Sequence, residues 1–186
     1  MSADTKNRIL ACARKLFQER GYNDVSMRDI ADAAGIQIGN LTYHYRRKEQ
    51  LLEALILQPN RRIYKPDHLC SIQDFTVYFR HLLQIQREAS FYFDSYIQIS
   101  QISRTLANAQ KEILGHLRSM ILEGLENLAR QGEIPAPLYE EEFADRTEII
   151  LDVLMLRLPG CERRKTSVQH DEIVMRQLMT VVGAHK

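Results

Sequence analysis

Apolar residues recur along this chain at the three- and four-residue spacing of a helical face. In the N-terminal part, Ile9, Ala13, Leu16 and Phe17 fall on one face of a first helix, and the interruptions between apolar stretches are mostly glycine or proline. No strand pattern with turn signals and no internal repeat is present. The pattern predicts an all-α fold.

Capping residues and glycines set the expected helix ends. Asp4 or Thr5 can cap the first helix, and Gly21 ends it. Ser26-Met-Arg-Asp29 has capping-box spacing, with Asp in place of Glu, and Gly35 ends that second helix. Further helices are expected at about 37–45, 48–58, 71–88, 91–102, 104–131, 139–158 and 167–183.

Two of these helices are joined through Ala34-Gly35-Ile36, which is typical of a helix-turn-helix. In this motif the second helix enters the DNA major groove. Ile30, Ala34, Ile36, Leu41 and Tyr45 are apolar and fit a shared core. The residues left to face outward carry amides, hydroxyls and rings and no acid, which suits a phosphate-lined groove: Gln37, Ile38, Asn40, Thr42, Tyr43 and His44.

Charge is distributed unevenly along the chain. Residues 1–65 contain 12 Lys and Arg against 7 Asp and Glu, whereas the remainder contains 13 against 17. The basic N-terminal part, residues 1–65, is called the head below. Its positive charge, beside the acidic remainder of the chain, favours a polyanion as the partner of the head alone. Pro59 and Pro66 flank a polar segment, so we expect a DNA-binding domain at 1–58 and a second helical domain at 59–186.

Several classes of protein are disfavoured. The three cysteines are far apart, which argues against disulfides or a zinc cluster and fits the cytoplasm. The histidines lack ligand spacing, and no phosphate loop or catalytic constellation is present, so we expect no metal, no cofactor and no enzyme activity. No apolar run reaches the length of a membrane span, and the first residues lack a signal core.

Three consecutive strings resemble the DNA-binding domain of the TetR/AcrR family of transcription regulators. They run from Ile9-Leu to Gly21-Tyr, then Ser26-Met-Arg-Asp-Ile-Ala-Asp-Ala-Ala-Gly35, then Gly39-Asn-Leu-Thr-Tyr-His-Tyr45-Arg-Arg-Lys-Glu49. The resemblance covers about residues 5–55, and the rest of the chain matches the family only in size and helical character. It implies a three-helix helix-turn-helix domain joined to a C-terminal helical bundle for ligand binding and dimerisation.

The resemblance implies a set of DNA contacts. The contacts fall on phosphates or base edges and are assigned to Ser26, Arg28, Gln37, Ile38, Gly39, Asn40, Thr42, Tyr43, His44 and Lys48. Against this, His44 could be a structural histidine, and Arg28 and Lys48 could be solvated charges. The chain departs from the family at Gln37, where a small hydroxylic residue is usual, at Thr42 in place of Tyr, and at Arg46-Arg47. Gln37 makes the cap of the recognition helix weaker. Together the departures affect which operator sequence is expected more than whether the protein binds DNA.

Seven of the fourteen Phe and Tyr residues lie between positions 75 and 96. For any one of these residues, packing in the helical core is a sufficient explanation. The resemblance instead implies that some of them line an effector pocket between C-terminal helices, where Tyr hydroxyls and Gln98 supply the polar groups. The candidates for that pocket are Phe75, Tyr78, Phe79, Tyr92, Phe93 and Tyr96, with Phe91 in the same cluster and His116 and Met120 on the long helix.

The expected helix at 139–158 is apolar almost all round in its C-terminal half, so it is buried on more than one side. We expect it to pair with the last helix and their symmetry mates in a homodimer, although a monomer core could absorb both faces. The interface candidates are Ile150, Val153, Leu154, Leu156, Val174, Leu178 and Val181.

Together these features predict a homodimeric regulator that binds double-stranded operator DNA. Repression relieved by an unknown small-molecule effector is the commoner behaviour in the family. The alternative is a helical protein that binds or sequesters a small molecule and keeps a DNA-binding head it does not use. Effector, operator, regulated genes and the choice between activator and repressor are not determined by the sequence.

Overall fold

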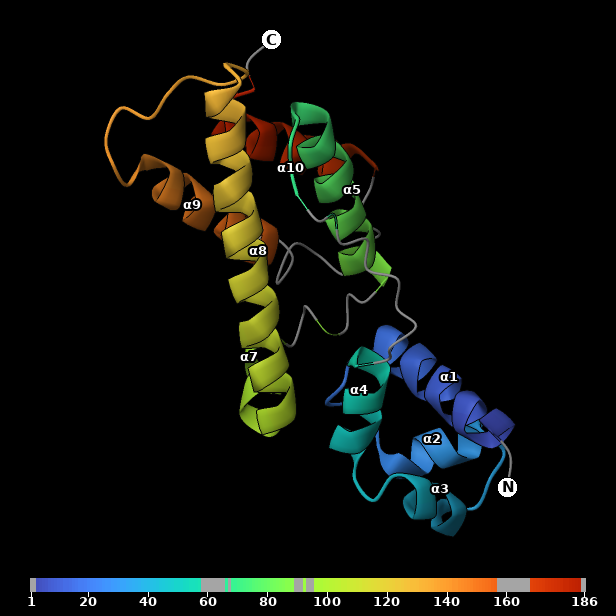
Figure 1. Cartoon of the computed structure of the whole chain (residues 1–186). Coiled ribbons are helices and arrows are strands. Elements are labelled where there is room, and N and C mark those ends of the chain that lie inside the picture. Colours follow the sequence, from blue (N-terminus) through green and yellow to red (C-terminus); the bar gives the residue numbers. More distant parts are fainter. Residues whose placement is uncertain are drawn as a thin grey trace. The chain divides into compact units, whose positions relative to one another are not determined.

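The computed structural model describes residues 3–57, 66, 68–88, 92, 96–156 and 168–184 (Figure 1). Within these ranges every regular element is an α-helix, as the apolar spacing predicts. Contacts divide the chain into two units. Unit 1 comprises Met1–Arg62 and Ala89–Asn108, and unit 2 comprises Ile63–Glu88 and Ala109–Lys186.

Unit 1 contains the N-terminal helices and a later segment. Its helices are α1 (Ala3–Arg20), α2 (Met27–Ala33), α3 (Ile38–His44), α4 (Lys48–Ile56), α7 (Tyr96–Ile102) and the start of α8 (Arg104–Arg130). The predicted stripe of α1 lies inward, with Ile9, Ala13 and Phe17 fully buried. Ile99 and Leu106 complete this core, although they lie far beyond the boundary expected near residue 58.

Unit 2 is formed by α5 (Ile72–Glu88), the rest of α8, α9 (Glu142–Leu156) and α10 (Val168–Val182). Ion pairs join α5 to α10, between Arg80 and Glu172 at 2.7 Å and between Arg87 and Asp171. On α8, Gly124 lies directly against the Phe75 ring of α5. The apolar faces of all four helices meet in one core, whose largest members include Phe75, Phe79 and Ile121.

The start of α9 differs from the expectation. The helix begins at Glu142 rather than near 139, and residues 138–141 form turns. Glu142 accepts a hydrogen bond from the backbone N–H of Leu138 at 2.5 Å and also pairs with Arg146. This carboxylate therefore fixes the approach to the helix, and Leu138 stays exposed.

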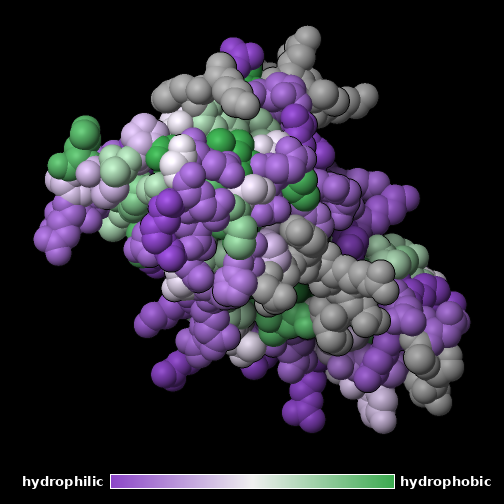
Figure 2. Space-filling model, turned by 45° about the horizontal axis from the view of Figure 1, so that its top comes forward, coloured by the Kyte–Doolittle hydropathy of each residue, from purple (hydrophilic) through white to green (hydrophobic). Residues whose placement is uncertain are grey.

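Among the described residues, no helix is both long enough and apolar enough to cross a membrane. In the same residues, no group of three or more His, Cys, Asp and Glu side chains could hold a metal ion. On the face drawn in Figure 2, hydrophilic residues cover most of the surface, and apolar residues occupy small separate areas.

Candidate nucleic-acid interface

Ser26 caps the start of α2 through a reciprocal pair of hydrogen bonds with Asp29. The Ser26 hydroxyl accepts from the Asp29 backbone N–H at 3.2 Å, and the Asp29 carboxylate accepts from the Ser26 backbone N–H at 2.7 Å. These bonds confirm the capping box and hold the pKa of the Asp29 carboxyl below its usual value. Both polar groups of Ser26 are thus engaged by Asp29, and a phosphate contact by Ser26 stays a prediction.

The turn between α2 and α3 is built on Gly35. Its φ is 62°, in the left-handed region that glycine adopts without strain. The N–H groups of Gly35 and Ile36 donate back to Asp32 and Ala31, both at 3.0 Å, and close the end of α2. Beyond this turn, Leu41 of α3 is fully buried in the core that contains Ile30. A single anchored residue therefore fixes the short helix α3.

The outer face of α3 is exposed. Tyr43 is 79% and Ile38 is 41% exposed, and Gln37 and Gly39 are also at the surface. The Thr42 hydroxyl donates within the helix, 3.1 Å from the carbonyl oxygens of Ile38 and Gly39. Gln37 stands at the N-cap without a side-chain capping bond, as expected from the loss of a small hydroxylic residue there.

Asn40 and His44 lie on another side of α3, one helical turn apart. Both are half-buried, and the Asn40 Oδ1 and His44 Nε2 atoms are shielded from solvent with no hydrogen-bond partner among the described residues. The Tyr43 and His44 rings meet edge to face, with centroids 5.4 Å apart. Base contacts by Asn40 and His44 stay predictions, and in this conformation those two atoms do not face outward.

Lys48, at the start of α4, is directed inward. Its ammonium donates to the carbonyl oxygens of Tyr22 at 2.7 Å and Val25 at 2.8 Å, with that of Asn23 at 3.5 Å. It also lies 4.2 Å from the centre of the Tyr22 ring, within cation–π range. Burial lowers the pKa of Lys48. The geometry gives Lys48 a structural part in holding the loop after α1, and its phosphate contact stays a prediction.

Three exposed arginines lie close to α3 along the chain. Arg28 is on α2, and Arg46 and Arg47 lie between α3 and α4. The carboxamide of Gln50 accepts a hydrogen bond from the Arg46 backbone N–H at 2.7 Å and fixes that connection. The arginine side chains are therefore carried by ordered backbone, which suits contacts to a phosphate chain.

Sequence reasoning missed two contacts that join the later segment of unit 1 to the head. The Asn23 amide donates to Gln98 of α7 at 3.1 Å, and the Ser103 hydroxyl donates to Glu53 of α4 at 2.5 Å. The Ser103 oxygen also accepts from the Leu106 N–H and caps α8. The Ser103-Arg-Thr-Leu106 spacing signals such a cap, but nothing in the sequence indicates Glu53 as its partner.

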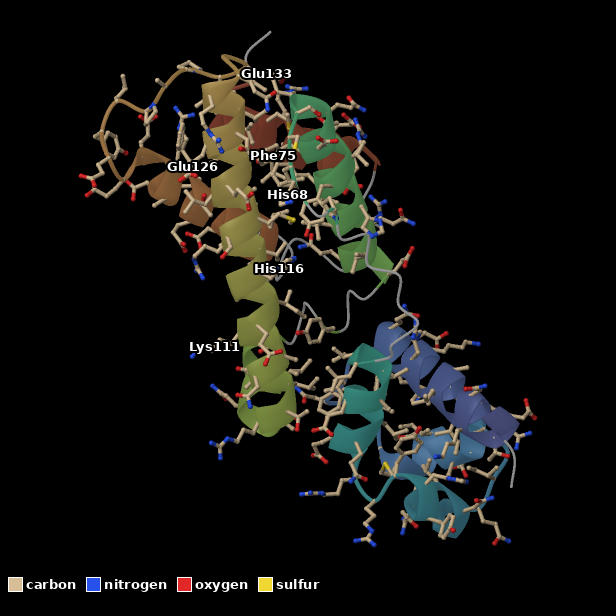
Figure 3. All side chains as sticks on the ribbon, in the orientation of Figure 1. His68, Phe75, Lys111, His116, Glu126 and Glu133 are labelled. Atoms are coloured by element: carbon tan, nitrogen blue, oxygen red, sulfur yellow. The ribbon has the colours of Figure 1, made fainter. Side chains whose placement is uncertain are left out.

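The structure does not gather the aromatic cluster into one set. Phe75, Tyr78, Phe79 and Met120 are buried in the core of unit 2, and Phe75 lies between α5 and α8 (Figure 3), whereas Tyr92 is buried in the core of unit 1. His116 is exposed on α8. Phe91, Phe93 and the Tyr96 side chain lie outside the described residues. Effector contacts by this cluster stay predictions.

Sequence reasoning also missed Gln86, which is 4% exposed on α5. Its amide group donates to the Leu154 carbonyl at 2.7 Å, while its Oε1 atom has no hydrogen-bond partner among the described residues. The signal was present, because Gln86 continues the apolar stripe of Phe75, Phe79 and Leu83. A buried unpaired acceptor calls for a donor such as a water or a ligand.

Several of the dimer candidates lie in the core of unit 2, and their part in an interface stays a prediction. Ile150, Leu154, Val174 and Leu178 are buried inside unit 2 of a single chain, so they retain almost no surface for a partner. Val153 and Val181 are half-buried, and the burial of Leu156 is outside the described residues. Among the described side chains of α9 and α10, the large apolar ones that are exposed are Ile149 and Ile173, each at 48%.

The geometry of unit 1 defines a helix-turn-helix protein. Comparison with known proteins agrees for this part of the chain: the model of bacterial regulatory proteins of the tetR family matches residues 9–55. The regulator UidR of Escherichia coli is 41% identical over 58 residues, which are 31% of this chain and 30% of UidR. The repressor KstR2 of Mycolicibacterium smegmatis is 39% identical over 54 residues, 29% of this chain and 26% of KstR2. Each match thus covers less than a third of the relative's length.

Solved structures extend the likeness to the whole fold. A TetR-family transcriptional regulator from Marinobacter aquaeolei superposes with a TM-score of 0.82 at 18% identity, over 97% of this chain and 89% of that one. KstR2 of Mycobacterium tuberculosis superposes with a TM-score of 0.66 at 19% identity, over 98% and 95%. The sequence match to the tetR family is confined to residues 9–55, and the solved structures, at 18% and 19% identity, show that the fold is shared.

Proposed function

We propose that this protein is a cytoplasmic transcription regulator that binds a specific double-stranded operator through α3. The observation that carries the proposal is the outer face of α3. Tyr43 and Ile38 project from a helix whose opposite side is anchored by fully buried Leu41. An α-helix fits the major groove, where base edges are distinguishable, and a rigid helix presents its side chains in a fixed register.

Charge supports the same assignment. Residues 1–65 carry a net charge of +5, from 12 basic and 7 acidic side chains, and Arg28, Arg46 and Arg47 are exposed next to α3. Cations beside a groove-reading helix bind phosphates and fix its register on the duplex. With Ser26 and Lys48 engaged inside the head, these arginines are the side chains we expect to meet the phosphate backbone.

A homodimer accounts for operator recognition best, because a two-fold protein matches a pseudo-palindromic site. The revised interface is the exposed side of α9 and α10, centred on Ile149 and Ile173. Val153 lies one helical turn from Ile149 and Val181 two turns from Ile173, so the half-buried residues continue the same faces. In an isologous dimer, each of these helices meets a copy of the same surface.

We further propose repression that is released by a small molecule held in unit 2. The relative KstR2 is named a transcriptional repressor. Gln86 offers a buried acceptor without a donor among the described residues, on the same helix as the buried aromatic residues of α5. Helix α8 begins in unit 1 and continues in unit 2, so a ligand that reorients α8 would act on both. Such a ligand must bind better to the state that does not bind DNA.

The proposal is tested by a gel shift with the full-length protein and the DNA upstream of its own gene. A regulator of this kind retards that DNA at moderate salt in the presence of scrambled competitor, and Tyr43→Ala abolishes the preference. Tyr139→Ala is the matched control, because Tyr139 is also exposed but lies in the loop before α9. Equal binding to upstream and scrambled DNA contradicts the proposal and favours a ligand-binding protein with an unused head.

A further inference from the structure

The side chains on the outer face of α3 carry no charge and no amide, and their polar groups are the hydroxyls of Thr42 and Tyr43. The members of this face are Ile38, Gly39, Thr42 and Tyr43, which lie at the three- and four-residue spacing of one helical face. The Thr42 hydroxyl donates its hydrogen to backbone carbonyl oxygens within α3, so it has no hydrogen left to donate to a base, while its methyl group is available for apolar contact. Together they make an apolar surface with the Tyr43 hydroxyl at its edge.

Bases differ in what such a surface can recognise. Guanine is read chiefly by the bidentate fork of Arg or by Lys, and adenine by the amide of Asn or Gln. The outer face of α3 offers no cation, and the Asn40 Oδ1 atom is shielded. The exposed amide of Gln37 stands at the N-cap, at one end of this face, where it can read at most a base beside the central ones. Thymine is the base that presents a methyl group in the major groove, where apolar side chains contact it.

Gly39 lets this face approach the bases closely. A Cβ atom built on Gly39 meets no atom within 4 Å, so the space beside it is open. The backbone of α3 can therefore come nearer to the groove at Gly39 than at any neighbour with a side chain. Close approach brings the Ile38 and Tyr43 side chains within van der Waals reach of methyl groups on either side.

We propose that α3 recognises thymine methyl groups, so that the centre of each operator half-site consists of A·T pairs contacted by Ile38, Thr42 and Tyr43. This inference rests on the proposed DNA-binding function and specifies what the same surface binds.

The test removes only the methyl group. Full-length protein is used to enrich a duplex from a random-sequence pool, and each thymine of the enriched half-site is replaced in turn by deoxyuridine. At a contacted thymine the wild-type affinity falls about fourfold, because burying one such carbon is worth about 0.8 kcal/mol. In Ile38→Ala or Tyr43→Ala, the deoxyuridine effect disappears at the thymine that the missing side chain contacts.

Tyr139→Ala is the matched control, since Tyr139 is also an exposed aromatic residue but lies before α9, and it keeps the full deoxyuridine effect. Melting curves confirm that the exposed substitutions leave the fold unchanged. Equal affinity for thymine and deoxyuridine duplexes overturns the inference and leaves the proposed function standing, as does an enriched half-site without central thymines. A pool that yields no preferred duplex overturns both.

Discussion

The Lys48 ammonium of α4 lies 2.7 Å from the carbonyl oxygen of Tyr22 and 4.2 Å from the centre of the Tyr22 ring. One side chain thus ties the loop after α1 to the helix that follows α3. Burial is the largest cause that raises the Tyr22 pKa to about 12, so its ring stays neutral under the charge. The attachment of α4 to this loop therefore depends on a cation as well as on the apolar core.

Lys48→Met tests this role, because it keeps the length of the side chain and removes the charge. The carbonyls of Tyr22 and Val25 lose their donor, and we expect a loss of about 1 to 2 kcal/mol in the free energy of unfolding. Urea denaturation without DNA measures it. Lys15→Met is the control, because Lys15 is 76% exposed and its pair with Glu19 is 4.0 Å long; its change stays within about 0.5 kcal/mol. If Lys48→Met is as stable as the wild type, the structural role of Lys48 is wrong, and its side chain is available to contact a DNA phosphate.

The capping box of α2 makes the protein less stable as the pH falls into the acid range. Hydrogen bonds from Ser26 lower the folded-state pKa of Asp29 below its usual 3.8. A lowered carboxyl pKa contributes stability that is present above the unfolded pKa and is lost as pH falls through the folded pKa. We expect Asp29→Asn to melt below wild type at neutral pH, with a gap that closes below about pH 3.8.

Thermal melts across that pH range measure the gap. Asp32→Asn on the same helix serves as the control, because Asp32 is exposed and takes no part in the cap. The capping explanation is contradicted if the difference in melting temperature between Asp29→Asn and wild type stays constant down to acid pH. It is also contradicted if Asp32→Asn shows an equally large difference.

Gly124 is required for the packing of α8 on α5. A Cβ atom there would lie 2.7 Å from Phe75 Cζ and 2.9 Å from Leu69 Cβ, too close for any native contact. We expect Gly124→Ala to cost about 1 to 3 kcal/mol of stability through overpacking. Gly115→Ala, on the same helix with open space around it, should be stabilising by up to about 1 kcal/mol.

Phe75→Leu supplies a second readout for this contact. Combined with Gly124→Ala it should restore part of the loss, giving a coupling of at least about 0.5 kcal/mol in a double-mutant cycle. Additive losses, or a Gly124→Ala protein as stable as wild type, contradict the close approach of Phe75.

The proposed dimer surface on α9 and α10 is tested by placing charged residues on it. Ile149→Asp combined with Ile173→Asp places carboxylates on the exposed sides of α9 and α10, and we expect it to convert a dimer into a monomer with lower operator affinity. Light scattering after size exclusion gives the mass. Ile113→Asp, at a residue 46% exposed on α8, is the matched control and should remain dimeric. A wild-type monomer, or a double variant that still dimerises, argues against this surface.

The sequence predicts the local features of this fold well and the long-range ones poorly. The α1 stripe, the Ser26–Asp29 cap and the Gly35 turn depend on residues a few positions apart, and the structure confirms them. The inward course of Lys48 and the Ser103–Glu53 bond join distant positions with no signal in either neighbourhood. The apolar C-terminal half of α9 was ambiguous because burial in a core and in an interface demand the same residues, and Ile150 and Leu154 lie in the core.

The central claim is that the head reads a DNA sequence, and the salt dependence of binding tests it most directly. Fluorescence anisotropy of full-length protein with an enriched duplex and with its scrambled counterpart gives both affinities over a salt series. The account predicts a preference of at least about a thousandfold for the enriched duplex at physiological salt. It also predicts affinity that falls steeply as salt rises. Equal affinity for the two duplexes at every salt concentration would contradict it.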